Sequence, residues 1–179
     1  REKRGTVAGA LTLTLLYVLT MMGSSLLSGY LFRTGNVNRT NVLLNGLLSL
    51  LPLILWCVAN WCLTTLMDGE GSFRDIFISA AYSLTPFILI QIPLIAVSNL
   101  LTLEESAFYA FFYILSLLWL LVLLLVGNMT IHNVSMKRAL GTALLTVVGM
   151  VVILVLGFLL VNLAYTVFEF GRTIYRELI

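Results

Sequence analysis

The chain has 179 residues, of which 60% are hydrophobic and only 10% are charged. Soluble globular domains are nearer half apolar and a quarter charged, so this composition excludes a disordered chain, a nucleic-acid-binding module and an ordinary soluble enzyme. The net charge of +2 is too small to indicate a polyanionic partner. The composition therefore predicts an integral membrane protein.

The spacing of the charged residues predicts five transmembrane helices. They leave uncharged runs of 28 to 31 residues at 5–32, 40–67, 76–103, 106–136 and 139–168. A helix needs about 20 residues to cross a bilayer core, so each run can cross once and none can cross twice. The runs are continuous and rich in leucine, whereas barrel strands are short and alternate apolar with polar residues. We therefore predict an all-α, polytopic integral membrane bundle in one domain, with spans at 6–32, 41–67, 76–103, 107–134 and 140–168.

The basic residues predict the orientation of this bundle, because cytoplasmic loops carry an excess of Lys and Arg. With five spans, the two ends of the chain lie on opposite sides of the membrane. Six basic residues fall on the side of residue 1 and four on the other side. The sequence therefore predicts a multi-pass protein of the plasma membrane with a cytoplasmic N-terminus and an external C-terminus.

Small residues occur at helix-contact spacing in the first and last predicted spans. They are Gly5, Gly9, Ser25 and Gly29 in the first span, and Gly141, Gly149 and Gly157 in the last. Small residues let transmembrane helices approach closely. Their positions predict a compact bundle and a face for a partner, which is another integral membrane protein or a second copy.

The second and third predicted spans contain all three prolines, Pro52, Pro86 and Pro93. A proline removes a helical hydrogen bond and kinks or breaks the helix. Broken helices inside a membrane can build a substrate site, whereas simple kinks are repaired by nearby polar groups. We interpret the three prolines as kinks. The groups expected to repair them are Asn60, Ser83 and Gln91.

The two cysteines, Cys57 and Cys62, lie in the second span. Five residues apart on a helix, they point in different directions and cannot form a disulfide with each other. We expect both to be buried, unreactive thiols.

No Asp, Glu, Lys or Arg lies within any of the predicted spans, so all of their polar residues are uncharged or, in the case of His132, weakly basic. This argues against a proton relay, a voltage sensor or an ion-coupled pump. The sole histidine, His132, follows Asn128 by one turn. We interpret His132 as an interfacial or helix-packing residue and Asn128 as hydrogen-bonded to a neighbour. In the alternative they line a polar vestibule. The rival function is a passive channel or carrier for a small neutral solute, which is indicated by Pro52, Pro86, Asn60, Gln91 and Asn128.

Metal or cofactor chemistry is not expected. A single histidine without nearby carboxylates or thiolates makes no metal site. The loop 68–75 (DGEGSFRD) lacks the ligand series of a calcium loop and reads as a turn. In this loop Asp75 is expected to cap the third span and Phe73 to pack at the membrane surface.

The residues after the last span, 169–179, alternate between an apolar and a charged helical face. They predict either an amphipathic helix lying at the membrane interface or the emerging end of the last span.

Four motifs together resemble the bacterial branch of the Yip family. They are WCVANW (56–61), DGEGSF (68–73), YSLTP (82–86) and GNMTIHNVS (127–135). The Yip family comprises five-span membrane proteins named for their interaction with Rab-type GTPases in eukaryotes. The resemblance covers residues 40–179 and is most specific at 56–86. It implies a five-helix bundle without known catalytic activity, whose eukaryotic relatives act in membrane traffic.

The resemblance also bears on partners and on the residues of interest. Some bacterial members accompany sugar-import systems, which implies a non-enzymatic scaffold or accessory subunit beside an ABC transporter. The expected partners are the lipid bilayer and other integral membrane proteins or a second copy, with no nucleic acid. The resemblance implies that its matching positions form a structural signature of a helix hairpin. These positions are Trp61, Gly69, Gly71, Phe73, Tyr82 and Pro86. The candidate residues are these six and the polar residues of the spans, Asn60, Gln91, Asn128 and His132.

Overall fold

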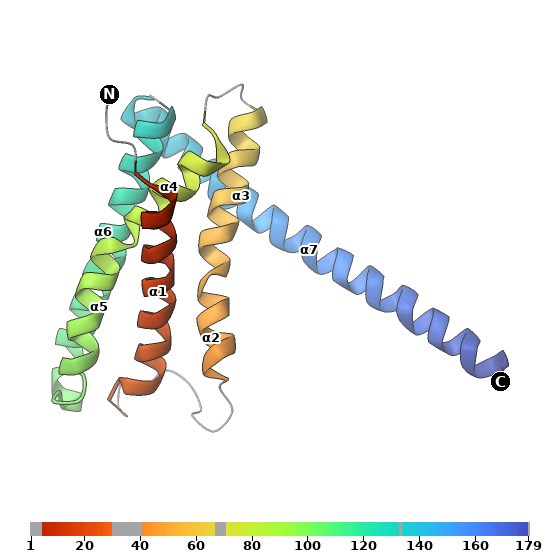
Figure 1. Ribbon diagram of the computed structural model, residues 1–179, viewed down its shortest axis with the longest axis horizontal. Helices are drawn as coiled ribbons and strands as arrows, with labels where there is room; N and C mark the ends of the chain where they lie inside the picture. Colours follow the sequence, from red (N-terminus) through yellow and green to blue (C-terminus); the bar gives the residue numbers. More distant parts are fainter. Residues whose placement is uncertain (1–4, 30–40, 67–70, 133, 179) are drawn as a thin grey trace.

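The computed structural model describes residues 5–29, 41–66, 71–132 and 134–178, and this part of the chain is helical apart from short connections (Figure 1). Its helices provide five segments that are long and apolar enough to cross a membrane, which confirms the predicted all-α, five-span fold. In chain order the helices are α1 (Val7–Leu27), α2 (Val42–Ser49), α3 (Leu51–Leu66), α4 (Phe73–Ser83), α5 (Thr85–Val97), the short 3-10 helix η2 (Leu103–Glu105), α6 (Ser106–His132) and α7 (Met136–Leu178).

Two of the five segments are each built from two helices. Only Leu50 separates α2 from α3, and only Leu84 separates α4 from α5. Pro52 and Pro86 lie in the first turns of α3 and α5, where a missing backbone N–H removes no helical hydrogen bond. The prediction of kinks is therefore wrong for these two prolines, because each begins a new helix. Pro93 lies within α5.

The break before α5 is repaired by a residue that sequence reasoning did not select. Pro86 leaves the carbonyl of Tyr82 without its usual donor, and the Thr85 hydroxyl donates to that carbonyl at 2.7 Å. The Ser83 hydroxyl donates instead to the carbonyl of Ser79 at 2.9 Å. The expected role of Ser83 is therefore wrong, because its side chain folds back along its own helix as Ser and Thr commonly do.

The first turn of α4 is capped by Ser72 and not by Asp75. The Ser72 Oγ accepts a hydrogen bond from the Asp75 backbone N–H at 3.2 Å, and the Ser72 hydroxyl donates to the Asp75 carboxylate at 2.8 Å. Asp75 occupies the third helical position, where its negative charge is favourable near the positive end of the helix. The prediction that Asp75 is the cap is wrong by one turn.

The core of the bundle lies where α4 and α5 meet the surrounding helices. α4 contacts α1, α3 and α6, and α5 contacts α1 and α6. Tyr17, Cys57, Ile76 and Phe87 belong to the central cluster, in which the rings of Tyr17 and Phe87 lie 5.6 Å apart. Many large apolar side chains outside this cluster are exposed on the surface of the bundle. This arrangement suits a bundle surrounded by lipid.

The two cysteines of α3 differ in their surroundings. Cys57 is 1% exposed, whereas Cys62 is exposed on the outer surface. The expectation that both are buried is wrong for Cys62, because five residues carry a side chain well around the helix axis.

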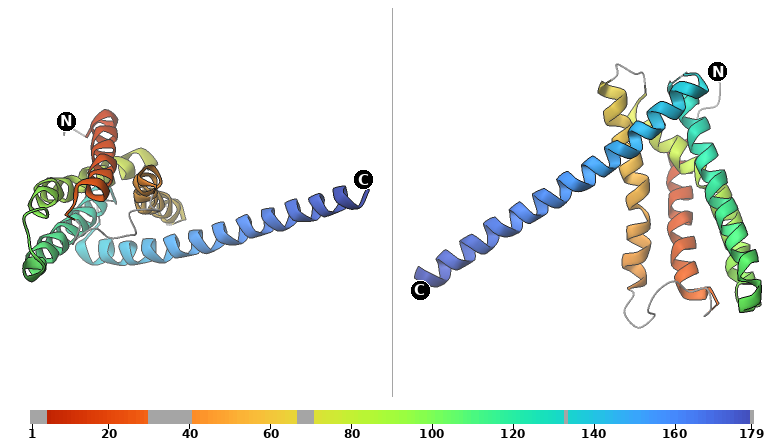
Figure 2. Two further views of the ribbon diagram at one scale, coloured as in Figure 1. Left: turned by 90° about the horizontal axis from the view of Figure 1, so that it is seen from below. Right: turned by 180° about the vertical axis from the view of Figure 1, so that it is seen from behind.

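The last helix, α7, leaves the bundle. Its first turns pack against α3 and α6, and Ala139 and Thr146 are fully buried there. Farther along, the helix projects away from the others (Figures 1 and 2), and no residue between Val151 and Arg176 is buried. Residues 169–178 continue α7 without a break. The placement of this tail at a membrane interface remains a prediction.

Candidate functional site

Three polar residues from two different spans meet inside the bundle. The Asn60 Nδ2 of α3 donates to the Asn128 Oδ1 of α6 at 3.1 Å, and the His132 Nε2 lies 3.2 Å from the Asn60 Oδ1. An amide oxygen can only accept, so the hydrogen of this second bond is on His132 Nε2. Asn60 and Asn128 are 4% and 3% exposed. Asn60 therefore joins two helices, and its expected role in repairing a proline break is wrong.

The helical repeat brings these groups together. Asn128 and His132 are four residues apart, so they lie on one face of α6, and Asn60 and Thr64 share a face of α3 in the same way. The Thr64 hydroxyl donates to the Asn60 carbonyl at 2.7 Å. Hydrogen bonds of this kind are strengthened in a low-dielectric interior, where an unpaired polar group is costly.

The cluster extends to α7 through Asn128. The Asn128 Nδ2 donates to the Thr142 Oγ1 at 2.9 Å and lies 3.5 Å from the carbonyl of Ala139. The Thr142 hydroxyl in turn donates to the Ala139 carbonyl at 3.0 Å. One amide side chain thus connects α3, α6 and α7. We call the group formed by Asn60, Thr64, Asn128, His132 and Thr142 the polar latch.

Sequence reasoning selected three members of the polar latch and missed Thr64 and Thr142. Threonine is common in transmembrane helices and usually bonds to the carbonyl three or four residues back in its own helix. Nothing in the sequence distinguishes these two from the other threonines of the spans. Their role becomes visible only when α3, α6 and α7 are placed side by side.

A cavity of about 480 Å³ adjoins the polar latch between α3, α6 and α7. Its volume is within the range of small-molecule sites. Arg138 is the only charged residue among those that line it. The full lining consists of Asn60, Leu63, Thr64, His132, Val134, Arg138, Gly141, Thr142 and Leu145.

The segment that leads into α4 runs against the histidine of the latch. A Cβ added to Gly71 would lie only 2.7 Å from the Cε1 of His132, so a larger residue at this position would displace the imidazole. The signature residue Gly71 thus supports the position of His132. Gly69, which belongs to the same predicted signature, lies outside the described residues.

Two aromatic members of the predicted signature are in contact at the surface. The rings of Trp61 on α3 and Phe73 on α4 lie 6.2 Å apart, edge to face, at an interplanar angle of 87°. Both side chains are partly exposed, at 43% and 45%. This contact joins the two sides of the α3–α4 hairpin near the polar latch. Such pairs stabilise a structure by about 0.5–1.5 kcal/mol beyond the area they bury.

Tyr82 and Pro86 lie farther along the same segment. A Cβ added to Gly9 would lie 2.5 Å from the Tyr82 Oη, and one added to Gly5 would lie 3.0 Å from its ring. The GxxxG pair of α1 therefore accommodates the tyrosine of α4. Pro86 is buried in the first turn of α5. These residues position helices and do not line the cavity beside the latch.

Gln91 is separate from the other polar candidates. Its Nε2 donates to the Ser116 Oγ at 3.4 Å, and the residue lines a different cavity. Like Asn60, it does not repair a proline break as expected. The candidates thus divide into the polar latch at one end of the bundle and Gln91 in a second cavity.

The chemistry of the latch is hydrogen bonding by amides, hydroxyls and one imidazole. Within the described residues, no group of three or more His, Cys, Asp and Glu is placed to hold a metal ion. The arrangement can fix helices relative to one another and can present polar atoms to the adjoining cavity.

Comparison with known proteins agrees with the five-span architecture. The sequence profile of the Yip1 domain matches residues 1–168, which include the first four apolar segments and most of α7. No curated protein and no solved structure matches the chain significantly. On the match over nearly the whole chain, this protein belongs to the Yip1 domain family.

Proposed function

We propose that the chain is a non-enzymatic membrane scaffold or accessory subunit that binds another integral membrane protein through α7. The observation that carries the proposal is the projection of α7. It is 43 residues long, and from Val151 to Arg176 it contacts no other described helix closely enough to bury a residue. A helix held away from its own bundle is free to pack against a partner.

One side chain on the projecting part of α7 favours a protein partner over lipid alone. The Asn162 Nδ2 donates to the carbonyl of Phe158 at 2.9 Å, and the Asn162 Oδ1 has no partner among the described residues. The side chain is exposed within an otherwise apolar stretch. Hydrocarbon chains cannot donate a hydrogen bond, whereas a second transmembrane helix can.

The polar latch supports the same proposal. It connects the first turns of α7 to α3 and α6 through Asn128, and so fixes the direction in which α7 leaves the bundle. A fixed direction lowers the entropy lost when a partner binds. The polar groups of the latch bond to one another and to backbone carbonyls, which is the pattern of a structural role.

The partner that we favour is a membrane subunit of a sugar ABC transporter. We place both proteins in the plasma membrane, with the N-terminus of this chain on the cytoplasmic side.

A photoreactive residue at Phe158, on the helical face of Asn162, is expected to cross-link to one integral membrane protein in native membranes. The same residue at Leu160, on the opposite face, is the matched control. The variant Asn162→Leu is expected to weaken the Phe158 cross-link several-fold, since an interhelical hydrogen bond contributes about 0.6–2 kcal/mol.

Each outcome of this experiment has a distinct meaning. A cross-link from Phe158 to a second copy makes the protein a scaffold for itself. A cross-link to a transporter subunit supports the accessory role. Equal cross-linking from both faces, to lipid only, contradicts docking through α7.

A second candidate function is a carrier for a small neutral solute. The observation that favours it is the pair of cavities, of about 550 and 480 Å³, whose lining residues are entirely different. Phe87 of the core lines the first cavity, and Asn60 lines the second. Proteoliposomes should then swell faster in glycerol than empty liposomes do. Swelling at the rate of empty liposomes excludes glycerol transport and contradicts this candidate.

A further inference from the structure

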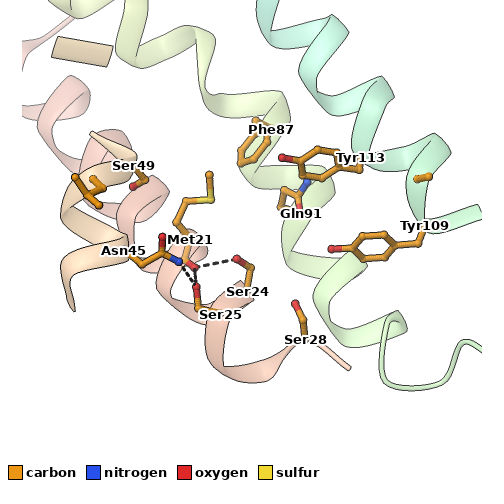
Figure 3. A pocket seen from close by; sticks show the side chains of 12 residues that line it. Met21, Ser24, Ser25, Ser28, Asn45, Ser49, Phe87, Gln91, Tyr109 and Tyr113 are labelled. Atoms are coloured by element: carbon orange, nitrogen blue, oxygen red, sulfur yellow. Dashed lines mark hydrogen bonds between the residues drawn. The ribbon is translucent and has the colours of Figure 1, made fainter. Parts of the chain in front are cut away.

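The larger of the two cavities lies between α1, α2, α5 and α6 (Figure 3). Its lining includes residues from the end of α1, from α2 and from the beginning of α6, whereas His132 of the polar latch is the last residue of α6, so the cavity and the latch lie at opposite ends of the bundle. The polar lining of the cavity consists of hydroxyls and amides, and none of its lining residues is charged. Among them, the Asn45 Nδ2 donates to the Ser25 Oγ at 2.8 Å, which closes the side between α1 and α2. The volume of about 550 Å³ is suited to a small ligand.

Gln91 is the most informative residue of this cavity. It is 3% exposed, and its one hydrogen bond within the described residues is the long contact of 3.4 Å to Ser116. Whichever way the amide is turned, one of its two terminal atoms has no partner among the described residues. Buried polar groups in folded proteins nearly always have a partner, so an unpaired amide that lines a cavity points to a bound group.

Aromatic residues form the rest of the wall. The rings of Phe87 and Tyr113 lie 6.4 Å apart at 73°, and Gln91 lies beside them (Figure 3). The hydroxyl ends of Tyr109 and Tyr113 point from α6 toward the cavity. The wall therefore combines ring faces with hydroxyl and amide groups, and it offers no charge to neutralise an ion. An ionic ligand would lose its hydration without compensation.

We propose that this cavity binds a neutral, polyhydroxylated ligand, with the Gln91 amide bonding to its hydroxyls and the aromatic rings packing on its C–H face. A sugar ring has this chemistry, whether it is the headgroup of a glycolipid or a free sugar. The inference does not rest on the docking of α7, because none of the residues of this cavity belongs to that helix.

The two sources are distinguished by two measurements on the full chain in lipid nanodiscs. Native mass spectrometry compares the retention of monoglucosyl diacylglycerol with that of phosphatidylglycerol and diacylglycerol of the same acyl chains. Saturation-transfer NMR tests methyl β-glucoside. A glycolipid site retains the glucosyl lipid about tenfold better than either control lipid, and a free-sugar site gives saturation transfer to the glucoside.

Variants tie either signal to the cavity. Gln91→Leu removes the amide, and Ser49→Phe fills the space from α2; each is expected to reduce binding about tenfold or more. Gln91→Leu should fold, because it replaces a buried amide that makes only one long hydrogen bond among the described residues with an apolar group of similar size. Thr65→Val, which removes an exposed hydroxyl on α3 outside this cavity, is the control and should bind as the parent does.

Either of two results would overturn the proposal. In the first, the glucosyl lipid is retained no better than the two control lipids and methyl β-glucoside gives no saturation transfer, as expected for a cavity that holds only water. Alternatively, binding survives in both Gln91→Leu and Ser49→Phe, which places it elsewhere on the protein. Neither result bears on the α7 cross-links, so the two proposals fail independently.

Discussion

Asn128 uses both ends of its amide to connect three helices. Its oxygen accepts from Asn60, and its nitrogen donates to Thr142. Removing this amide leaves a buried donor on Asn60 and a buried acceptor on Thr142 without their partners. A buried group left unsatisfied costs more than the net stabilisation that the bond provided.

The variant Asn128→Leu is therefore expected to lower the free energy of unfolding by about 1–3 kcal/mol, measured by denaturant titration in detergent micelles. Asn60→Leu should have a similar effect. The double variant should cost clearly less than the sum of the two, because both remove the same interaction. Strict additivity would show that the two amides do not depend on each other.

The sequence allows part of this network to be predicted. Asn60, Asn128 and His132 are distinctive because amides and imidazoles are rare in apolar spans. Their partners Thr64 and Thr142 are not distinctive, since threonines often bond within their own helix. That Gln91 meets Ser116 and lines a separate cavity depends on which helix faces are adjacent, and hydropathy does not determine this.

At the scale of elements, α1 and α5 meet where glycine is needed. The Gly29 N–H, just after α1, donates to the Ser98 Oγ at 2.9 Å. A Cβ at Gly29 would overlap the backbone carbonyl of Ser98, which cannot rotate away as a side chain can. By contrast, a Cβ at Gly157 of α7 would meet nothing within 4 Å.

These two glycines form a matched pair for substitution. Gly29→Ala is expected to destabilise the protein by about 1–3 kcal/mol through overpacking. Gly157→Ala is expected to be neutral or stabilising by up to about 1 kcal/mol, because alanine is the better helix former. Thermal unfolding in one detergent would compare them. Equal effects of the two substitutions would contradict the close contact at Gly29.

The existence of the elements could be predicted better than their detail. The intervals between charges indicate five spans because ionised groups are excluded from hydrocarbon. Pro52 and Pro86 are visible in the sequence, but whether a proline kinks a helix or begins a new one depends on what packs around it. The continuation of α7 past Glu169 follows from helix propensity in a segment that no other element interrupts.

At the scale of the whole molecule, the predicted orientation rests on the excess of basic residues on the side of residue 1, six against four. The chain crosses the membrane an odd number of times if all five apolar segments span it. In that case residues before α1 and residues at the end of α7 lie on opposite sides.

Cysteine labelling in intact cells tests this orientation. In a parent in which Cys57 and Cys62 are alanine, Lys3→Cys is expected to be protected from an impermeant maleimide, because the sequence predicts that this end is cytoplasmic. Tyr175→Cys is expected to react. Permeabilised cells, in which both positions react, provide the control. Reaction at both positions, or at neither, in intact cells would contradict five crossings.

The divergence of α7 from α3 has a consequence for the surrounding bilayer. At 1.5 Å per residue, α7 is about 65 Å long, roughly twice the thickness of the hydrocarbon core. If the other helices stand along the membrane normal, α7 is strongly tilted. The tilted helix enlarges the area that the protein occupies in the membrane plane. Acyl chains in the wedge between α7 and α3 are bounded on two sides by one polypeptide. We expect these chains to exchange with bulk lipid more slowly than ordinary annular lipids do, and a partner that enters the wedge to release them.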